Sequence, residues 1–460
     1  MQSKWNELNE QFAALYQKGQ YAEAGKMVDE LLKEGEATFE NEHPDLAASL
    51  NNIGEVFKAL GDYSKAETFH QKALSIREKM LKPDDPEIAS SLNNMAVLYK
   101  MQGKLYKAEA FHKRALEIKE KIFESDHPEI ALSLNNLGVT YKSNGQLHEA
   151  EKLYLRALEI REKRLGPEHQ DVATTLNNLA LLYDSQGNYA EAETLFCRSL
   201  NIMQKTHARD HLEVAIAKNN LGSVLKAQAK YDEAETLYKQ ALTIKEKVFG
   251  EESLQVAVLL ISLAELYKAQ GNLPAAEQLL NRSREIHEKL LGPDHPEVAT
   301  PLNHLAALHK AQGRFKDAEA LYKQALRITE RNLTPTHPNV AAALNNLAVL
   351  YDSRGRHAEA EPLYKRALVI IEEAHGPNHP SVASLMYNIA GLCKNQGDFP
   401  EAVTYYKRSL EIREYALGPD HYSVIAVLRS LAKLYRSVGQ ENEGKKYADR
   451  ARAIRAKFGT

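Results

Sequence analysis

The chain has 460 residues, of which 43% are apolar and 26% are charged, and its formal net charge is −3. This length exceeds what one hydrophobic core usually supports, so we expect several domains or an array of repeats. The small net charge gives no overall attraction to nucleic acid or to anionic membranes, and two cysteines, Cys197 and Cys393, exclude a disulfide framework or a Cys-rich metal site.

The first residues show no basic segment followed by an apolar one, which a secretory signal would need. No apolar run reaches the roughly 18–20 residues that cross a bilayer. Two isolated thiols fit small apolar fillers in a reducing compartment. We therefore expect a cytoplasmic protein with no membrane partner and no cofactor.

The sequence repeats every 42 residues. The triplet Leu-Asn-Asn starts at positions 50, 92, 134, 176 and 344, and related residues stand at the steps between them. Eleven units fit without an insertion or deletion. Every unit has a glycine at one position, except for Ala229, and an alanine five residues later, except for Gly444. Two small residues at fixed offsets indicate a tight turn and a close helix crossing.

In chain order, residues 1–41 are expected to form an N-terminal capping repeat. Residues 42–419 then hold nine regular repeats, and residues 420–460 a C-terminal repeat with a polar capping helix. We expect one continuous solenoid, because each unit can bury its apolar stripes only against its neighbours.

The fourth unit illustrates the predicted helix pair. Leu134, Leu137 and Tyr141 lie on one helical stripe, in a helix that starts at Pro128 and stops before Gly145. A second, longer apolar stripe runs from residue 147 and ends near residues 165–167. Each unit is therefore predicted to be helix, tight turn, longer helix and loop.

The spacing of Leu, small residue, Tyr, Gly, Ala, Tyr and Ala resembles the tetratricopeptide repeat family. It is seen here at Leu134, Gly138, Tyr141, Gly145, Ala150, Tyr154 and Ala157. The 42-residue length, the Leu-Asn-Asn helix and the loop at 291–296 resemble the repeats of kinesin light chain and of similar bacterial proteins. The resemblance implies an all-α, right-handed superhelix whose inner surface, lined by the first helix of each pair, holds peptide segments of partner proteins.

Histidine recurs just before the first helix of most units, at 43, 127, 169, 211, 295, 337, 379 and 421. A ladder of metal sites would require neighbouring units to share an ion. However, packed elements stand on the order of 10 Å apart, whereas zinc–nitrogen bonds are about 2.0–2.1 Å. We therefore interpret these residues as part of the loop and the helix start.

Asparagine recurs in the middle of the first helix, although it is a mediocre helix former. The first asparagine of the pair is present at Asn51, Asn93, Asn135, Asn177, Asn219, Asn303 and Asn345. It lies on a flank of the apolar stripe, and two roles remain open: hydrogen bonds between adjacent units, or amide groups offered to the backbone of a partner. For the second asparagine of the pair a structural role is favoured.

A basic column follows the first asparagine by seven residues. It contains Lys58, Lys100, Lys142, Lys226, Lys268, Lys310, Lys394 and Arg436, and it is interrupted by Asp184 and Asp352. One interpretation is a solvated helix end that suits the helix dipole. The other is a cationic, amide-rich track for acidic extended peptides. Similar residues line tetratricopeptide domains that clamp carboxylates.

The seventh unit departs from this pattern, because Ile261 stands where the other units have asparagine. With Val258 and Ile216 it is predicted to form an apolar notch in the groove, unless this unit has merely drifted. No phosphate-binding loop, metal-binding helix motif or nucleophile elbow is visible, so we expect no enzyme. The leading hypothesis is a protein-interaction scaffold for acidic peptide segments, and the alternative is an RNA-binding solenoid that uses the basic column. The oligomeric state stays open.

Overall fold

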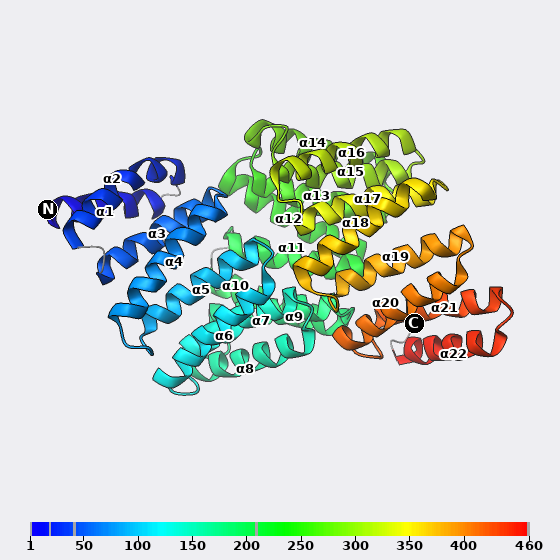
Figure 1. Ribbon diagram of the computed structural model, residues 1–460, viewed down its shortest axis with the longest axis horizontal. Helices are drawn as coiled ribbons and strands as arrows, with labels where there is room; N and C mark the ends of the chain where they lie inside the picture. The colour runs from blue at the N-terminus through cyan, green and yellow to red at the C-terminus, as the bar shows by residue number, and fades with distance from the viewer. Residues whose placement is uncertain (1, 18–19, 40–42, 208–209, 458–460) are drawn as a thin grey trace. The chain divides into compact units, whose positions relative to one another are not determined.

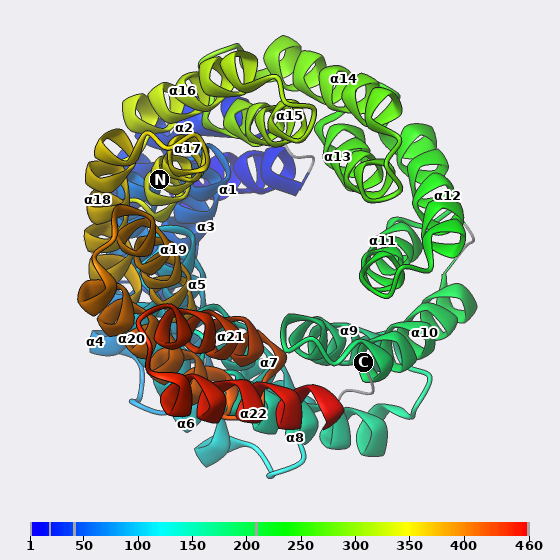
Figure 2. The same ribbon diagram turned by 90° about the vertical axis from the view of Figure 1, so that its right-hand side faces the viewer.

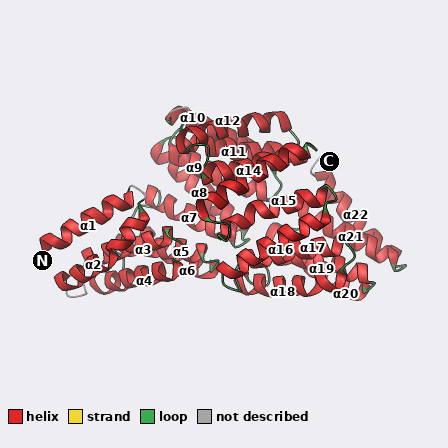
Figure 3. Cartoon of the chain, turned by 90° about the horizontal axis from the view of Figure 1, so that it is seen from above, coloured by secondary structure: helices red, strands yellow, loops and turns green. Residues whose placement is uncertain are grey.

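The computed structural model describes residues 2–17, 20–39, 43–207 and 210–457. This part of the chain contains 22 α-helices and one short 3-10 helix, and it has no strand (Figure 3). The all-α prediction is therefore confirmed, and the helices alternate as first and second members of helix-turn-helix pairs (Figure 1).

The first helices of the pairs are α1 (Gln2–Gln17), α3 (Pro44–Ala59), α5 (Pro86–Met101), α7 (Pro128–Ser143), α9 (Gln170–Ser185), α11 (Leu212–Ala227), α13 (Leu254–Ala269), α15 (Ala299–Ala311), α17 (Pro338–Ser353), α19 (Pro380–Gln396) and α21 (Tyr422–Ser437). The 3-10 helix η1 (Pro296–Val298) precedes α15. The second helices are α2 (Tyr21–Phe39), α4 (Tyr63–Met80), α6 (Leu105–Ile122), α8 (Leu147–Leu165), α10 (Tyr189–Thr206), α12 (Tyr231–Phe249), α14 (Leu273–Leu291), α16 (Phe315–Asn332), α18 (His357–His375), α20 (Phe399–Leu417) and α22 (Glu441–Lys457).

The recurrent histidines cap the first helices. His127, for example, accepts a hydrogen bond from the Glu129 backbone N–H at 3.2 Å, and proline follows it at the first helical position. The same histidine cap occurs at each of the other seven histidines of the column, 43, 169, 211, 295, 337, 379 and 421, and proline follows it at 43, 295, 337 and 379. The cap satisfies one of the backbone donors that a helix start leaves unpaired. The predicted role at the helix start is confirmed.

A residue with positive φ forms the turn between the two helices of a pair. Gly271 has φ +81°, and its N–H donates to the Lys268 carbonyl at 3.1 Å, so that the turn closes within three residues. Ala229 occupies the same place one unit earlier with φ +60°. It is the one non-glycine residue with positive φ in the described part of the chain. The predicted alanine column, from Ala24 to Ala402, is fully buried where the helices of a pair cross.

A ladder of glutamates connects neighbouring units through their second helices. Glu319 of α16 accepts hydrogen bonds from Tyr351 at 3.1 Å and from Arg356 at 2.6 Å, both in the next unit. Equivalent contacts across one unit boundary are made by Glu67, Glu109, Glu151, Glu193, Glu235, Glu277 and Glu361. Each exposed pair contributes less than about 1 kcal/mol, but the repetition fixes the register of one unit on the next.

Contacts between Cα atoms divide the chain into two compact units, residues 1–144 and 145–460, which we call the first and the second unit block. In the second block, the odd-numbered helices follow the inner side of a curve and the even-numbered helices its outer side (Figure 2). The curve brings α8 into contact with α20. A methyl group at Gly145 would lie 2.4 Å from Pro380 Cδ, and one at Gly187 would lie 3.8 Å from Tyr422 Cβ. Gly187 follows Gly145 by 42 residues, and Tyr422 follows Pro380 by the same number, so the contact repeats in register one repeat later.

Candidate peptide-binding face

The candidate site is the inner face, by which we mean, within each unit block by itself, the exposed and half-buried positions of the odd-numbered helices. These helices direct their Leu and Ala stripes into the core and leave the asparagine and lysine columns on the other side. Because the period is one unit, each column places the same position of successive helices side by side.

The lysines of the inner face differ in their partners. Lys58 pairs with Glu55, and Lys268 pairs with Glu265 at 2.7 Å. Lys142 is half-buried, and Lys394 is exposed. Lys100, Lys226 and Lys310 are half-buried and have no ion pair among the residues that the structure describes.

Desolvation is the main influence on these three unpaired amines. Burial lowers the pKa of Lys100, of Lys226 and of Lys310. For Lys226 the charges of Glu265 and Asp184 counteract this lowering of the pKa, and for Lys310 the charge of Asp352 does. An ammonium that has lost water without gaining a carboxylate favours an incoming anion.

The first asparagines make hydrogen bonds of two kinds. In the second and third units of the chain, Asn51 and Asn93 contact the ring Nδ1 of His70 and of His112, at 2.9 and 3.1 Å, in the second helix of the same pair. Burial, together with the charge of Lys100, lowers the pKa of His112 to about 4. Asn135 is buried, at 6% exposure.

Further along the chain, the asparagine contacts cross from one unit to the next. The Asn220 side-chain amide donates to Asn177 at 2.8 Å, and that of Asn388 donates to Asn345 at 2.9 Å. Of the two roles that the sequence left open for the first asparagine, hydrogen bonding to protein neighbours is therefore observed at these positions. The second asparagine supplies the donor.

In the described part of the chain, two members of the first-asparagine column, Asn219 and Asn303, do not have such a hydrogen bond on their side-chain oxygen. The buried side-chain oxygens of Asn219 and Asn303 accept no hydrogen bond within the described ranges. For Asn219 the cause is local, because Ser262 stands where its amide donor would be expected. A buried acceptor without a partner is unfavourable by about 1–3 kcal/mol.

The predicted apolar notch is only partly exposed. Ile216 and Val258 are 42% and 55% exposed on α11 and α13. Ile261, however, is 8% exposed and packs in the core with Leu280 and Leu305, so the expectation that it lines the groove is wrong. A β-branched apolar side chain at this flank rotates into the interface between units, where asparagine would seek a polar partner.

Two inner-face residues were missed by the sequence analysis. Leu132 is 40% exposed and occupies the column of Ile216 and Val258, two units before Ile216. Glu265 lies 2.9 Å from the ring of His304 as well as beside Lys268. Burial raises the pKa of Glu265, but the hydrogen bonds from His304 and Lys268 outweigh it and bring the pKa to about 2. Both residues could have been identified from the sequence by comparing all equivalent positions of the first helices, and not only the most regular ones.

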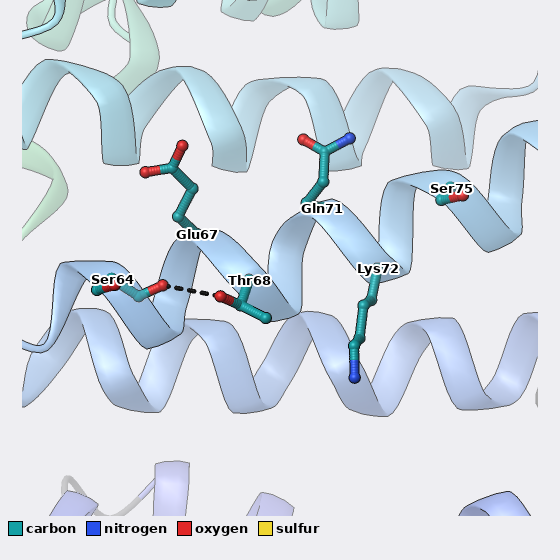
Figure 4. Close-up of a pocket in the computed structure, with 6 residues that line it drawn as sticks. All are labelled: Ser64, Glu67, Thr68, Gln71, Lys72 and Ser75. Atoms are coloured by element: carbon teal, nitrogen blue, oxygen red, sulfur yellow. Dashed lines mark hydrogen bonds between the residues drawn. The ribbon is translucent and has the colours of Figure 1, made fainter.

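A pocket of about 620 Å³ lies away from this face, on the second helix α4 (Figure 4). Its lining is polar and includes Glu67 and Lys72, which leave α4 on opposite sides. Glu67 already serves the inter-unit ladder by accepting from Gln102 at 3.0 Å. The pocket therefore belongs to the scaffold rather than to the candidate site.

The residues that the structure describes contain no group of three or more His, Cys, Asp or Glu side chains arranged to hold a metal ion. None of the described helices is both long and apolar enough to pass through a membrane.

Helix pairs of similar length, tight turns and contacts that repeat from unit to unit define a helical-repeat solenoid. The chain belongs to the tetratricopeptide repeat family. The family model matches residues 8–79, 87–163, 130–205, 171–247, 213–289, 255–331, 297–373, 339–415 and 382–457. Proteins of this family generally act as protein-interaction scaffolds. No curated protein matches the chain.

Solved structures that this chain matches include a putative kinesin light chain of Podosopora anserina with nearly identical TPR-like repeats. It is 27% identical, with a TM-score of 0.40, over 44% of this chain and 96% of that one. BtubC (BKLC) from P. vanneervenii is 22% identical, with a TM-score of 0.41, over 54% and 92% of the two chains. A Rap protein complexed with Competence and Sporulation Factor is 14% identical, with a TM-score of 0.51, over 81% and 99%.

Proposed function

We propose that this chain is a non-catalytic scaffold that binds extended peptide segments of partner proteins along its inner face. The observation that carries the proposal is the set of half-buried ammonium groups of Lys100, Lys226 and Lys310, which have no ion pair in the described structure. Carboxylate side chains of a partner would supply the missing charge.

The exposed apolar side chains of Ile216 and Val258, on the neighbouring first helices α11 and α13, support a peptide segment with an apolar residue. A few buried anchors supply most of the affinity of an interface. The Rap protein, which shares this fold, was solved with a factor bound.

The test is a pull-down with the full chain and with a variant that carries Lys100→Gln, Lys226→Gln and Lys310→Gln. Partner peptides, mapped from the recovered proteins, should bind the variant at least about tenfold more weakly in low salt, because three favourable charge contacts are lost. The dependence of the affinity on salt should also become shallower.

The matched control changes Lys26, Lys316 and Lys445 to glutamine, which alters the net charge equally but on second helices, at exposed positions. Circular dichroism verifies that both variants remain helical. Equal affinity of the two variants for every mapped peptide would refute the inner face as the binding surface.

A further inference from the structure

On the first helices of the second unit block, one four-residue sequence occurs twice, four repeats apart. Leu-Tyr-Asp-Ser occurs at 182–185 and again at 350–353, 168 residues later. One nearby hydrogen bond recurs as well, whereas His357 and Asn395, which contact Asp352, correspond to Tyr189 and Ala227 168 residues earlier. The Asn220–Asn177 hydrogen bond corresponds to Asn388–Asn345, at 2.8 and 2.9 Å. Asp184 and Asp352 are therefore equivalent positions, and both replace a lysine of the basic column.

In the basic column, three lysines stand between the two aspartates. Asp184 is followed, one unit at a time, by Lys226, Lys268, Lys310 and then Asp352. With Glu265, which pairs with Lys268, this stretch has three acidic and three basic side chains. Its formal charge is zero, so a uniformly acidic segment gains little from the stretch as a whole.

The carboxylate of Asp352 has room for a further partner. His357 and Asn395 contact it at 3.0 and 3.2 Å, and both contacts use Oδ1. Oδ2 is left without a partner among the described residues. A carboxylate has about four acceptor positions, so Oδ2 can receive the N–H group of a ligand ammonium or guanidinium.

We infer that the segment bound by the second unit block is itself divided by charge, with a basic residue at each end and acidic and apolar residues between them. The basic residues would meet Asp184 and Asp352, the acidic ones Lys226 and Lys310, and the apolar one Ile216 and Val258. This inference rests on the proposed function, and it specifies the ligand of the same face.

Geometry sets the spacing of the two basic residues. Neighbouring units are on the order of 10 Å apart, so four steps span at most about 40 Å along the inner side of the curve. An extended chain advances about 3.3 Å per residue. The two basic residues should therefore stand about 10–12 positions apart.

The test uses three fluorescent peptides with the full chain, measured by anisotropy at low salt. The first has lysines 11 positions apart around an acidic centre with one leucine. The second has the same composition with acidic ends and a basic centre, and the third has the acidic centre with uncharged ends. The first peptide should bind at least about fivefold more tightly than the other two, as expected for two partly desolvated charge pairs.

The variant Asp184→Asn, Asp352→Asn should reverse part of this order, weakening the first peptide severalfold and strengthening the third. The control Asp29→Asn, Asp232→Asn removes two exposed carboxylates from second helices and should change neither. Equal binding of the first and third peptides, unaffected by the aspartate variant, overturns the inference but leaves the proposed function intact. Failure of all three to bind, together with unaltered pull-downs by the lysine variant, overturns both.

Discussion

Ala229 adopts a backbone conformation that the other turns assign to glycine. Its φ of +60° places the methyl group against the following carbonyl, which costs an L-residue roughly 1–2 kcal/mol. Glycine avoids this cost but loses more entropy on folding, so the two effects partly cancel.

We expect Ala229→Gly to raise the free energy of unfolding by about 1 kcal/mol. The reverse change one unit later, Gly271→Ala, should lower it by a similar amount, because φ is +81° there and no atom lies within 4 Å of the added methyl group. Urea denaturation measures both. A destabilised Ala229→Gly variant would show that the methyl group contributes packing that the turn geometry does not suggest.

Ile216 and Val258 allow a test of the exposed apolar surface with residues that the same column already uses. Threonine stands at 174 and 300, so Ile216→Thr with Val258→Thr keeps the β-branched shape and should leave stability nearly unchanged. Affinity for a leucine-containing partner peptide should fall by about 1–2 kcal/mol, measured by calorimetry. Val369→Thr, on the outer helix α18 and 53% exposed, serves as the control and should bind normally.

Glu265 of α13 pairs with Lys268 of the same helix and with His304 of α15, so this ion-pair cluster connects two neighbouring repeats. Hydrogen bonds from His304 and Lys268 lower the pKa of Glu265 to about 2, against the effect of burial. A group whose pKa is lowered by folding stabilises the protein above its unfolded pKa, and that contribution is lost as pH falls toward the folded pKa.

Between pH 5 and pH 2.5, the wild-type protein should therefore lose more stability than Glu265→Gln, by an amount on the order of 1–3 kcal/mol. Guanidinium denaturation at a series of pH values provides the comparison. Glu285→Gln removes an exposed carboxylate from α14, and its pH profile should parallel that of the wild type. Parallel profiles for Glu265→Gln would mean that the cluster is equally populated in the unfolded chain.

Helix boundaries were predictable because local chemistry sets them. Proline at the start and glycine after the end predict a helix from Pro128 to the residue before Gly145. The structure has a helix over Pro128–Ser143, and one further residue lies in the turn. Histidine caps were likewise predictable, since a cap involves residues two apart. The burial of Ile261 was not predictable, because it depends on packing against Leu280 in the second helix of the same repeat and against Leu305 in the next repeat. Which lysines have a carboxylate partner was predictable too, because the column three residues before them has glutamate only at 55 and 265, where Lys58 and Lys268 are paired.

On the scale of the whole molecule, near-neighbour contacts dominate, so the loss of one repeat should remove one share of stability. In the first unit block, deleting residues 93–134 joins equivalent positions and should leave a folded chain with one-eleventh less helix. In the second block, deleting residues 261–302 should cost more than this share. It removes one of the repeats between Gly145 and Pro380, whose close approach requires the full set.

Thermal unfolding followed by circular dichroism compares the two deletions, which are equal in length. The contact itself is tested by Gly145→Ala against Gly355→Ala. Both residues have φ near +72°, but only at 145 would the methyl group meet Pro380. Equal melting temperatures for the two alanine variants would contradict a contact between the turn before α8 and the start of α19.

This contact also has a mechanical consequence. A coil whose successive turns do not touch lengthens freely, like an open spring, because each unit needs to rotate only slightly on its neighbour. The second unit block resembles a spring wound until its turns meet, with Gly145 against Pro380 and Gly187 against Tyr422. Its initial stiffness under tension should therefore exceed the stiffness that the hinges between its repeats would give in series, and should drop once these two contacts part. A single-molecule pulling trace would record that drop as an early, reversible step before any helix pair unfolds.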